Sequence, residues 1–119
     1  MEVNVNNSCI FVDRTEYIIR LKDIFVDCDS LGLRESGLLI RQIIEENLKF
    51  NDYVTIDFEG IWLITQGFAD EIIGVIVRNK GVDFVKNKIK VVNANDFIRN
   101  TLNWVVSYSK KMAQNTSSS

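Results

Sequence analysis

Four carboxylates flank a short polar turn near the middle of the chain, within the segment VTIDFEGIWLITQGFADEIIG at 54–74. Asp57 and Glu59 precede the turn at 65–67, and Asp70 and Glu71 follow it. Paired carboxylates can act as general acid and base in hydrolysis. We do not expect that chemistry here, because the chain has no histidine and lacks phosphate-binding glycine motifs. The carboxylates alone therefore do not indicate an enzyme, and we expect neither a metal nor a cofactor.

The turn Thr65-Gln66-Gly67 separates an apolar strand-like run from a helix-like run. Thr65 is suited to capping the helix, although Gln66 or Gly67 could also take the cap position. A helix N-terminus that follows a strand can bind an anion, and a threonine there can be phosphorylated. The simpler interpretation is a capped helix start in which Asp70 and Glu71 complement the helix dipole.

Composition predicts one cytoplasmic domain. The chain has 119 residues, of which 46 % are hydrophobic and 25 % charged, and its net charge is −2. This balance gives no basic footprint for nucleic acid or an anionic membrane. No apolar run approaches the roughly 20 residues that span a bilayer, and the first residues lack a signal-peptide pattern. We therefore predict no nucleic-acid or membrane partner.

Hydrophobic periodicity predicts alternating strands and helices. Apolar positions recur at helical spacing in three long segments, and β-branched residues are concentrated in the segments between them. The predicted fold is a single-domain α/β sandwich with a mixed β-sheet and about three helices, in the order β-β-α-β-α-β-α. The domain is predicted at 1–112, followed by a flexible polar tail at 113–119. The predicted elements are a hairpin of strands 8–13 and 16–21, helix 34–49, strand 53–58, helix 67–81, strand 88–94 and helix 95–112.

The stretch TIDFEGIWLITQGFADEIIG resembles the core motif of the STAS-like family of domains of unknown function. It is more distantly similar to STAS domains, named for sulfate transporters and anti-sigma factor antagonists. The shared features are an aspartate-aromatic pair at 57–58, an acidic residue and glycine at 59–60, a hydroxyl residue at Thr65 and the Phe-Ala-Asp-Glu run at 68–71. Upstream, Arg34 and Ser36 resemble the family's arginine-containing entry to the first helix. The resemblance implies a STAS-like sandwich.

The resemblance also implies a regulatory protein-interaction module without enzymatic activity. Anti-sigma antagonists bind an ATPase of the histidine-kinase-like type through the strand-turn-helix, which is 57–71 here. That kinase phosphorylates a serine in the turn, and the added charge weakens the complex. Gly67 takes the serine position here and has no hydroxyl, so Thr65 is the nearby candidate phosphosite. The implied partner-binding residues are Arg34, Thr65, Gln66, Gly67, Phe68, Asp70 and Glu71.

Two other functions stay open. The first is a small-molecule, anion or nucleotide-binding domain that uses the helix start with Arg34 nearby. The second is a phage-encoded inhibitor that occludes a host protein with the same scaffold. The oligomeric state is also open.

Residues outside the motif carry three further expectations. Trp62 is either an exposed interaction anchor or packed against a helix. Trp104 lies near the apolar stripe of the last predicted helix and is expected in the core. Lys86, Lys88 and Lys90 alternate along a predicted strand, as on a solvated sheet edge that resists aggregation.

Overall fold

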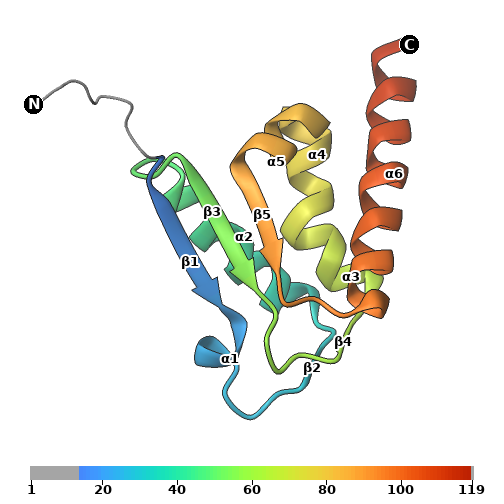
Figure 1. The fold of residues 1–119 in the computed structure, drawn as a ribbon. Helices are drawn as coiled ribbons and strands as arrows, with labels where there is room; N and C mark the ends of the chain where they lie inside the picture. Colours follow the sequence, from blue (N-terminus) through green and yellow to red (C-terminus); the bar gives the residue numbers. More distant parts are fainter. Residues whose placement is uncertain (1–13, 119) are drawn as a thin grey trace, which may run out of the picture.

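A parallel three-stranded sheet forms the centre of the fold (Figure 1). The computed structural model describes residues 14–118, and its sheet has the strand order β1-β3-β5. The strands are β1 (Glu16–Arg20), β3 (Tyr53–Asp57) and β5 (Ile89–Val92), and both neighbouring pairs are parallel. A second, two-stranded parallel sheet pairs β2 (Ser30–Leu31) with β4 (Leu63–Ile64). The second sheet brings the segment before the first long helix beside the turn at 65–67.

The described residues form five helices, when the three consecutive segments from Gln66 to Lys80 are counted as one helix. That helix contains one π-helical turn, η1, between two α-helical parts. None of the helices in this part of the chain is long and apolar enough to cross a membrane. The helical segments are α1 (Leu21–Ile24), α2 (Arg34–Asn47), α3 (Gln66–Ala69), η1 (Asp70–Gly74), α4 (Val75–Lys80), α5 (Val82–Lys88) and α6 (Asp96–Ser118).

The core lies between one face of the larger sheet and the long helices. Strand side chains alternate between the two faces, and Val54 and Ile56 of β3 are completely buried. They join a cluster that includes Ile40 of α2, Ile72 of η1 and Ile98 of α6. In Figure 1 the opposite face of the sheet is turned toward the viewer, and no described helix crosses it. The helices that carry the candidate site are therefore anchored on the buried face.

The three long predicted helices are present, but the predicted count of about three is too low for residues 14–118. The additional helices are α1 and α5, which have four and seven residues. Such short segments do not repeat an apolar stripe over several turns, so periodicity does not reveal them. The predicted segment 34–49 corresponds to α2, and 67–81 corresponds to the continuous helix from α3 to α4.

The two ends of the chain compare differently with the prediction: the first predicted strand lies outside the described residues, and the predicted tail is largely helical. The segment 16–21 forms β1, which pairs in parallel with β3, whereas its predicted hairpin partner at 8–13 lies outside the described residues. Every described strand pair is parallel. The described strands therefore do not include the antiparallel pairing that a mixed sheet requires. At the other end, α6 continues to Ser118 through the segment predicted as a tail. Neither glycine nor proline interrupts that segment.

Candidate functional site

Thr65 fixes the turn to both the helix and the neighbouring strand. Its backbone is extended, and its Oγ1 accepts a hydrogen bond from the Phe68 N–H at 3.1 Å. The same hydroxyl donates to the carbonyl oxygen of Gly32 at 2.9 Å, and the Thr65 N–H donates to Leu31 at 3.1 Å. The predicted role of Thr65 as the N-cap is thus confirmed. Phosphorylation of Thr65 would require the hydroxyl to give up the bond that it donates to Gly32.

Replacing Thr65 with alanine should lower the free energy of unfolding by about 1–2 kcal/mol, because the Phe68 N–H loses its side-chain acceptor. Thr65→Ser keeps the capping oxygen and should lose less than half as much. Urea denaturation of both variants beside the wild type measures the difference. Equal losses would show that the threonine methyl group, which lies next to Gly32, stabilises the turn instead of the cap.

Five charged side chains form a cluster behind the turn, which we call the arginine–carboxylate cluster. Arg34 Nη1 lies 3.2 Å from Asp70 Oδ2 and 3.1 Å from Glu71 Oε2. On the other side of Glu71, Arg41 Nη1 lies 3.1 Å from Oε1. Arg78 donates to Asp70 from both terminal guanidinium nitrogens, with Nη1 2.7 Å from Oδ1 and Nη2 3.3 Å from Oδ2. The cluster therefore joins α2, η1 and α4.

Mutual hydrogen bonds favour the charged forms of Asp70, Arg34 and Arg78. Hydrogen bonds from Arg78 and then Arg34 hold the pKa of Asp70 below its ordinary value of 3.8, against the opposing effect of burial. The hydrogen bond to Asp70 in turn raises the pKa of both arginines. Three arginines face two carboxylates, so the cluster has an excess of one positive charge.

Gly74, at the end of the π turn, allows α6 to pack directly against this cluster. A Cβ atom at Gly74 would overlap with Asp70 Oδ1 and would lie 2.9 Å from both Ser109 Oγ and Val105 Cγ1. Ser109 is completely buried and accepts a hydrogen bond of 3.0 Å from Arg78 Nη1. The missing side chain at Gly74 thus makes room for the contact between η1 and α6.

A groove of about 380 Å³ lies beside the cluster, between the helix that starts at Gln66 and α6. The α6 wall presents Trp104, Tyr108 and Met112, which we call the aromatic shelf. The rings of Trp104 and Tyr108 stack with their centroids 5.2 Å apart and an interplanar angle of 6°. The two residues are 50 % and 47 % exposed. The remaining lining residues are Arg34, Gln66, Asp70, Arg78 and Val105.

The structure brings most of the predicted site residues together. Arg34 lies over Gly67, with its Nε 3.4 Å from where a Cβ would stand, and it also reaches Asp70 and Glu71. Gln66 is exposed at the mouth of the groove. The prediction that Phe68 belongs to the partner-binding surface needs correction, because its side chain is completely buried. It anchors the helix start in the core and cannot offer side-chain contacts at the surface.

The two tryptophans lie at the surface. Trp62 is 72 % exposed, which agrees with an exposed position and not with packing against a helix. Its role as an interaction anchor stays a prediction. The expected core position of Trp104 is wrong, since half of this residue is exposed. Arg78 and the aromatic shelf were not predicted as site residues. The shelf residues 104, 108 and 112 follow one another at a spacing of four, which places them on one helix face and could have indicated a common surface.

The structure does not gather the four carboxylates into one site. Asp57 Oδ1 accepts hydrogen bonds of 2.9 Å from the Glu59 N–H and from Asn93 Nδ2, which fixes the loop after β3. Asp70 and Glu71 instead pair with arginines. Within residues 14–118, no three His, Cys, Asp or Glu side chains converge as metal ligands.

Residues 36–98 match the family described as a STAS-like domain of unknown function. The matched region includes α2 from Ser36 onward, the turn at 65–67, the continuous helix and the start of α6, whereas Arg34 lies just before it. No curated protein and no solved structure matches the chain.

Proposed function

We propose a function from the family, since the chain belongs to the STAS-like domains of unknown function. The chain is a non-enzymatic regulatory module that binds a partner protein. The proposed surface comprises Arg34 and the turn at Thr65, Gln66 and Gly67, together with the aromatic shelf. Asp70 and Glu71 support this surface by holding Arg34. We call Arg34, the turn at 65–67 and the aromatic shelf together the turn–shelf surface.

The observation that carries the proposal is the exposed Trp104–Tyr108 stack beside Arg34. Tryptophan, tyrosine and arginine are the residues most enriched among the dominant contacts of protein interfaces. Half of each aromatic residue is open to solvent although α6 has a fully buried face next to it. Large rings exposed in a groove offer apolar area that a partner side chain can cover.

The cluster favours a rigid interface. Arg34 is held by two carboxylates, although 60 % of its side chain is exposed. Because its rotamers are already restricted, less conformational entropy is lost when a partner binds. Its remaining guanidinium N–H groups can donate to the partner, which would then carry acceptor groups opposite Arg34 and an apolar side chain opposite the shelf.

An ATPase of the histidine-kinase-like type is the first partner to test, by analogy with anti-sigma antagonists. A phosphorylation switch at the turn is not part of the proposal. Gly67 lacks a hydroxyl, and the hydroxyl of Thr65 is engaged as a cap. A phage-encoded inhibitor would use the same surface to occlude a host protein, so the identity of the captured partner separates these two functions.

An anion site at the turn is the weaker candidate. Arg34, the cation beside the helix start, is already paired with Asp70 and Glu71. An anion bound there would have to compete with two carboxylates for the same guanidinium group. This arrangement favours a protein surface at the turn.

Substitutions of Trp104 and Gln66, two exposed residues of the turn–shelf surface, should weaken partner binding and leave the fold intact. We expect Trp104→Ala to raise the dissociation constant at least about tenfold, as for an aromatic residue at the centre of an interface. Gln66→Arg should weaken binding as well, because Gln66 lines the groove and the longer side chain would occupy space that the partner needs. Tagged protein would first capture partners for mass spectrometry, and calorimetry with the purified partner would then measure the affinities.

Phe50→Ala is the matched control, since Phe50 is an aromatic residue that is 76 % exposed and lies outside the proposed surface. It should bind like the wild type. If Trp104→Ala and Phe50→Ala have the same affinity, the turn–shelf surface is not the interface. Thr65 and Asp70 are unsuitable as binding probes, because both stabilise the local structure.

A further inference from the structure

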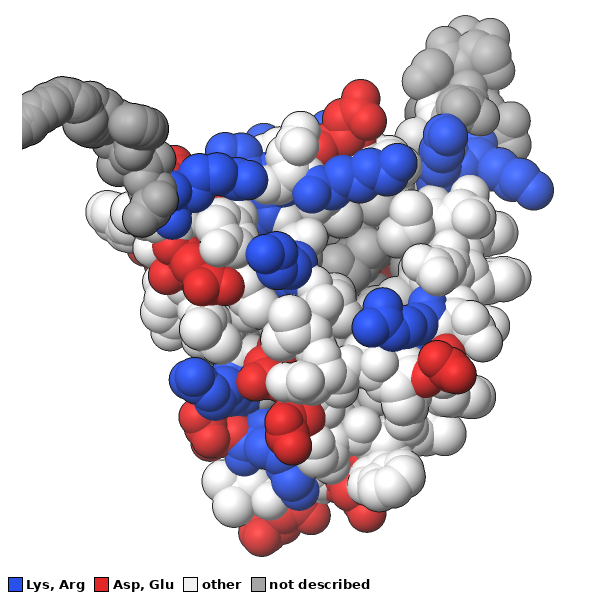
Figure 2. Space-filling model, viewed as in Figure 1, with Lys and Arg blue, Asp and Glu red and all other residues white. Residues whose placement is uncertain are grey.

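A second pocket lies at the opposite end of the sheet from the turn, where β3 and β5 begin. It has a volume of about 450 Å³ and is lined by Arg14, Tyr53, Lys86, Asn87, Ile89 and Lys90. Figure 2 shows Lys and Arg side chains gathered across the upper part of this face of the molecule. The whole chain has a net charge of −2, so this positive region does not follow from an overall basic composition.

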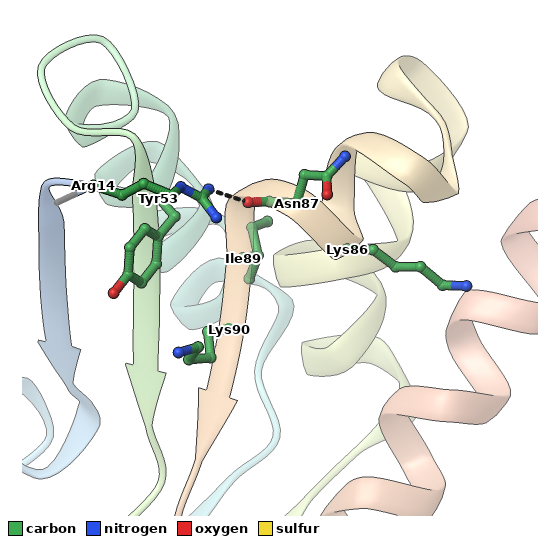
Figure 3. Close-up of a pocket in the computed structure, with 6 residues that line it drawn as sticks. All are labelled: Arg14, Tyr53, Lys86, Asn87, Ile89 and Lys90. Carbon is green, nitrogen blue, oxygen red and sulfur yellow. Dashed lines mark hydrogen bonds between the residues drawn. The ribbon is translucent and has the colours of Figure 1, made fainter. Parts of the chain in front are cut away.

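Two cations converge on one aromatic ring in this pocket. The Arg14 guanidinium carbon lies 4.8 Å from the centroid of the Tyr53 ring, and Lys90 Nζ lies 5.3 Å from the same centroid. Arg14 Nη2 also donates to the carbonyl oxygen of Asn87 at 2.6 Å. Figure 3 shows these side chains in front of β3 and β5, with the Lys86 side chain extending away from Tyr53. Arg14 and Lys90 are therefore the inner cations, and Lys86 is at the rim.

The cations of this pocket have no carboxylate within the pocket to pair with. None of the lining residues is acidic. Within residues 14–118, Arg14, Lys86 and Lys90 form no ion pair, whereas Arg34, Arg41 and Arg78 all do. Asp52 is the carboxylate next to Tyr53 in the chain, and its Oδ2 accepts the Thr15 N–H at 2.8 Å. Asp52 also attracts Arg14 electrostatically, but it does not line the pocket. The guanidinium N–H groups of Arg14 that do not bond Asn87, together with the Lys90 ammonium group, remain available to an anion.

We propose that this second pocket, around Tyr53, binds the phosphoryl group of a small phosphorylated compound. A phosphate dianion matches the charge of Arg14 and Lys90, and guanidinium groups donate paired hydrogen bonds to phosphate oxygens. The pocket volume exceeds what a single phosphate ion fills, and Tyr53 and Ile89 provide apolar walls for an organic substituent. This site is separate from the turn–shelf surface, and it does not depend on partner binding there.

Titration of the ¹⁵N-labelled protein with inorganic phosphate, followed by amide chemical shifts, tests the proposal. We expect saturable shifts centred on Arg14, Tyr53 and Lys90, and weaker binding as the ionic strength rises. Phenyl phosphate should bind more tightly than inorganic phosphate if the natural ligand is an organic ester. Equal affinity for the two would assign the site to free phosphate.

Substitutions separate a built site from a general charge effect. Lys90→Met and the double variant Arg14→Gln/Lys90→Met should raise the dissociation constant for phosphate, by about tenfold or more in the double variant. Lys111→Met removes the same charge from an exposed position on α6 outside the pocket, and it should leave binding unchanged. The single variant at Lys90 keeps the Arg14–Asn87 hydrogen bond, so it tests the site even if the double variant unfolds.

The proposal is overturned if the shifts do not saturate in the millimolar range, or if Lys111→Met weakens binding as much as Lys90→Met. It is also overturned if neither phosphate compound binds and only a glutamate-rich peptide does. That last result would identify the pocket as a docking site for an acidic protein segment.

Discussion

Replacing Gly74 with alanine should lower the free energy of unfolding by about 3 kcal/mol. Overfilling a packed core typically costs about 1–3 kcal/mol, and displacing a charged hydrogen bond costs about 1.5–3 kcal/mol more. Both effects apply here, because the new methyl group would overlap with Asp70 Oδ1 and would press on Val105 and Ser109 of α6. The structure can relieve the overlap by moving Asp70 away from Arg78 or by moving α6 outward. Urea denaturation would give the change in stability.

Gly67→Ala is the matched control, because both glycines belong to the continuous helix from Gln66 to Lys80. A Cβ at Gly67 would stand 3.4 Å from Arg34 Cγ and Nε, which is ordinary contact. In a helix, alanine is favoured over glycine by about 0.5–1 kcal/mol, so Gly67→Ala should be neutral or slightly stabilising. If the two substitutions have equal effects, α6 does not pack against η1 as closely as the structure shows.

The position of Gly74 connects packing to the proposed function. Its lack of a side chain lets α6 approach η1, which brings the aromatic shelf beside Arg34 and Gln66. A π turn accommodates one more residue than an α-helical turn and is frequent at functional sites. If Gly74→Ala moves α6 outward, it should therefore alter the turn–shelf surface as well as the stability. Its effect on partner binding is expected to exceed that of Thr65→Ala.

Local sequence patterns predicted the main elements and the helix start. The 3.6-residue periodicity identified α2, the continuous helix and α6, and the β-branched runs identified β1, β3 and β5. The hydroxyl of Thr65 has the chemistry and position of a cap, and it acts as one. These features depend on neighbours within a few residues along the chain.

Features that depend on contacts between distant segments were not predictable in the same way. The apolar stripe of α6 does not show where its buried face ends, so Trp104 was assigned to the core although it borders a groove. Phe68 belongs to the same motif as Thr65, but only the packed structure shows that its ring points inward. Arg78 lies eight residues after Asp70, and their ion pair spans the π turn. Helical spacing alone does not indicate such a turn.

Arg78→Met should lower the free energy of unfolding by about 2 kcal/mol at neutral pH, and this loss should shrink in acid. Arg78 and Asp70 are mostly buried, with side-chain exposures of 26 % and 19 %, so the unpaired carboxylate would lose a charged hydrogen-bond donor. The folded protein holds the pKa of Asp70 below the ordinary value of 3.8. Asp70 therefore contributes stability above pH 3.8, and that contribution is lost as the pH falls through the lowered pKa of the folded state.

Urea denaturation of the wild type, Arg78→Met, Asp70→Asn and the double variant between pH 7 and pH 2.5 separates this pair from other carboxylates. At neutral pH the cycle should give a coupling free energy of about 1–2 kcal/mol, which should decrease toward zero in acid. Asp70→Asn should show a shallower loss of stability in acid than the wild type, because it lacks the titrating group. A coupling that stays constant across this pH range would show that Arg78 stabilises α4 and α6 through Ser109 and the packing of its alkyl chain, and not through the charge of Asp70.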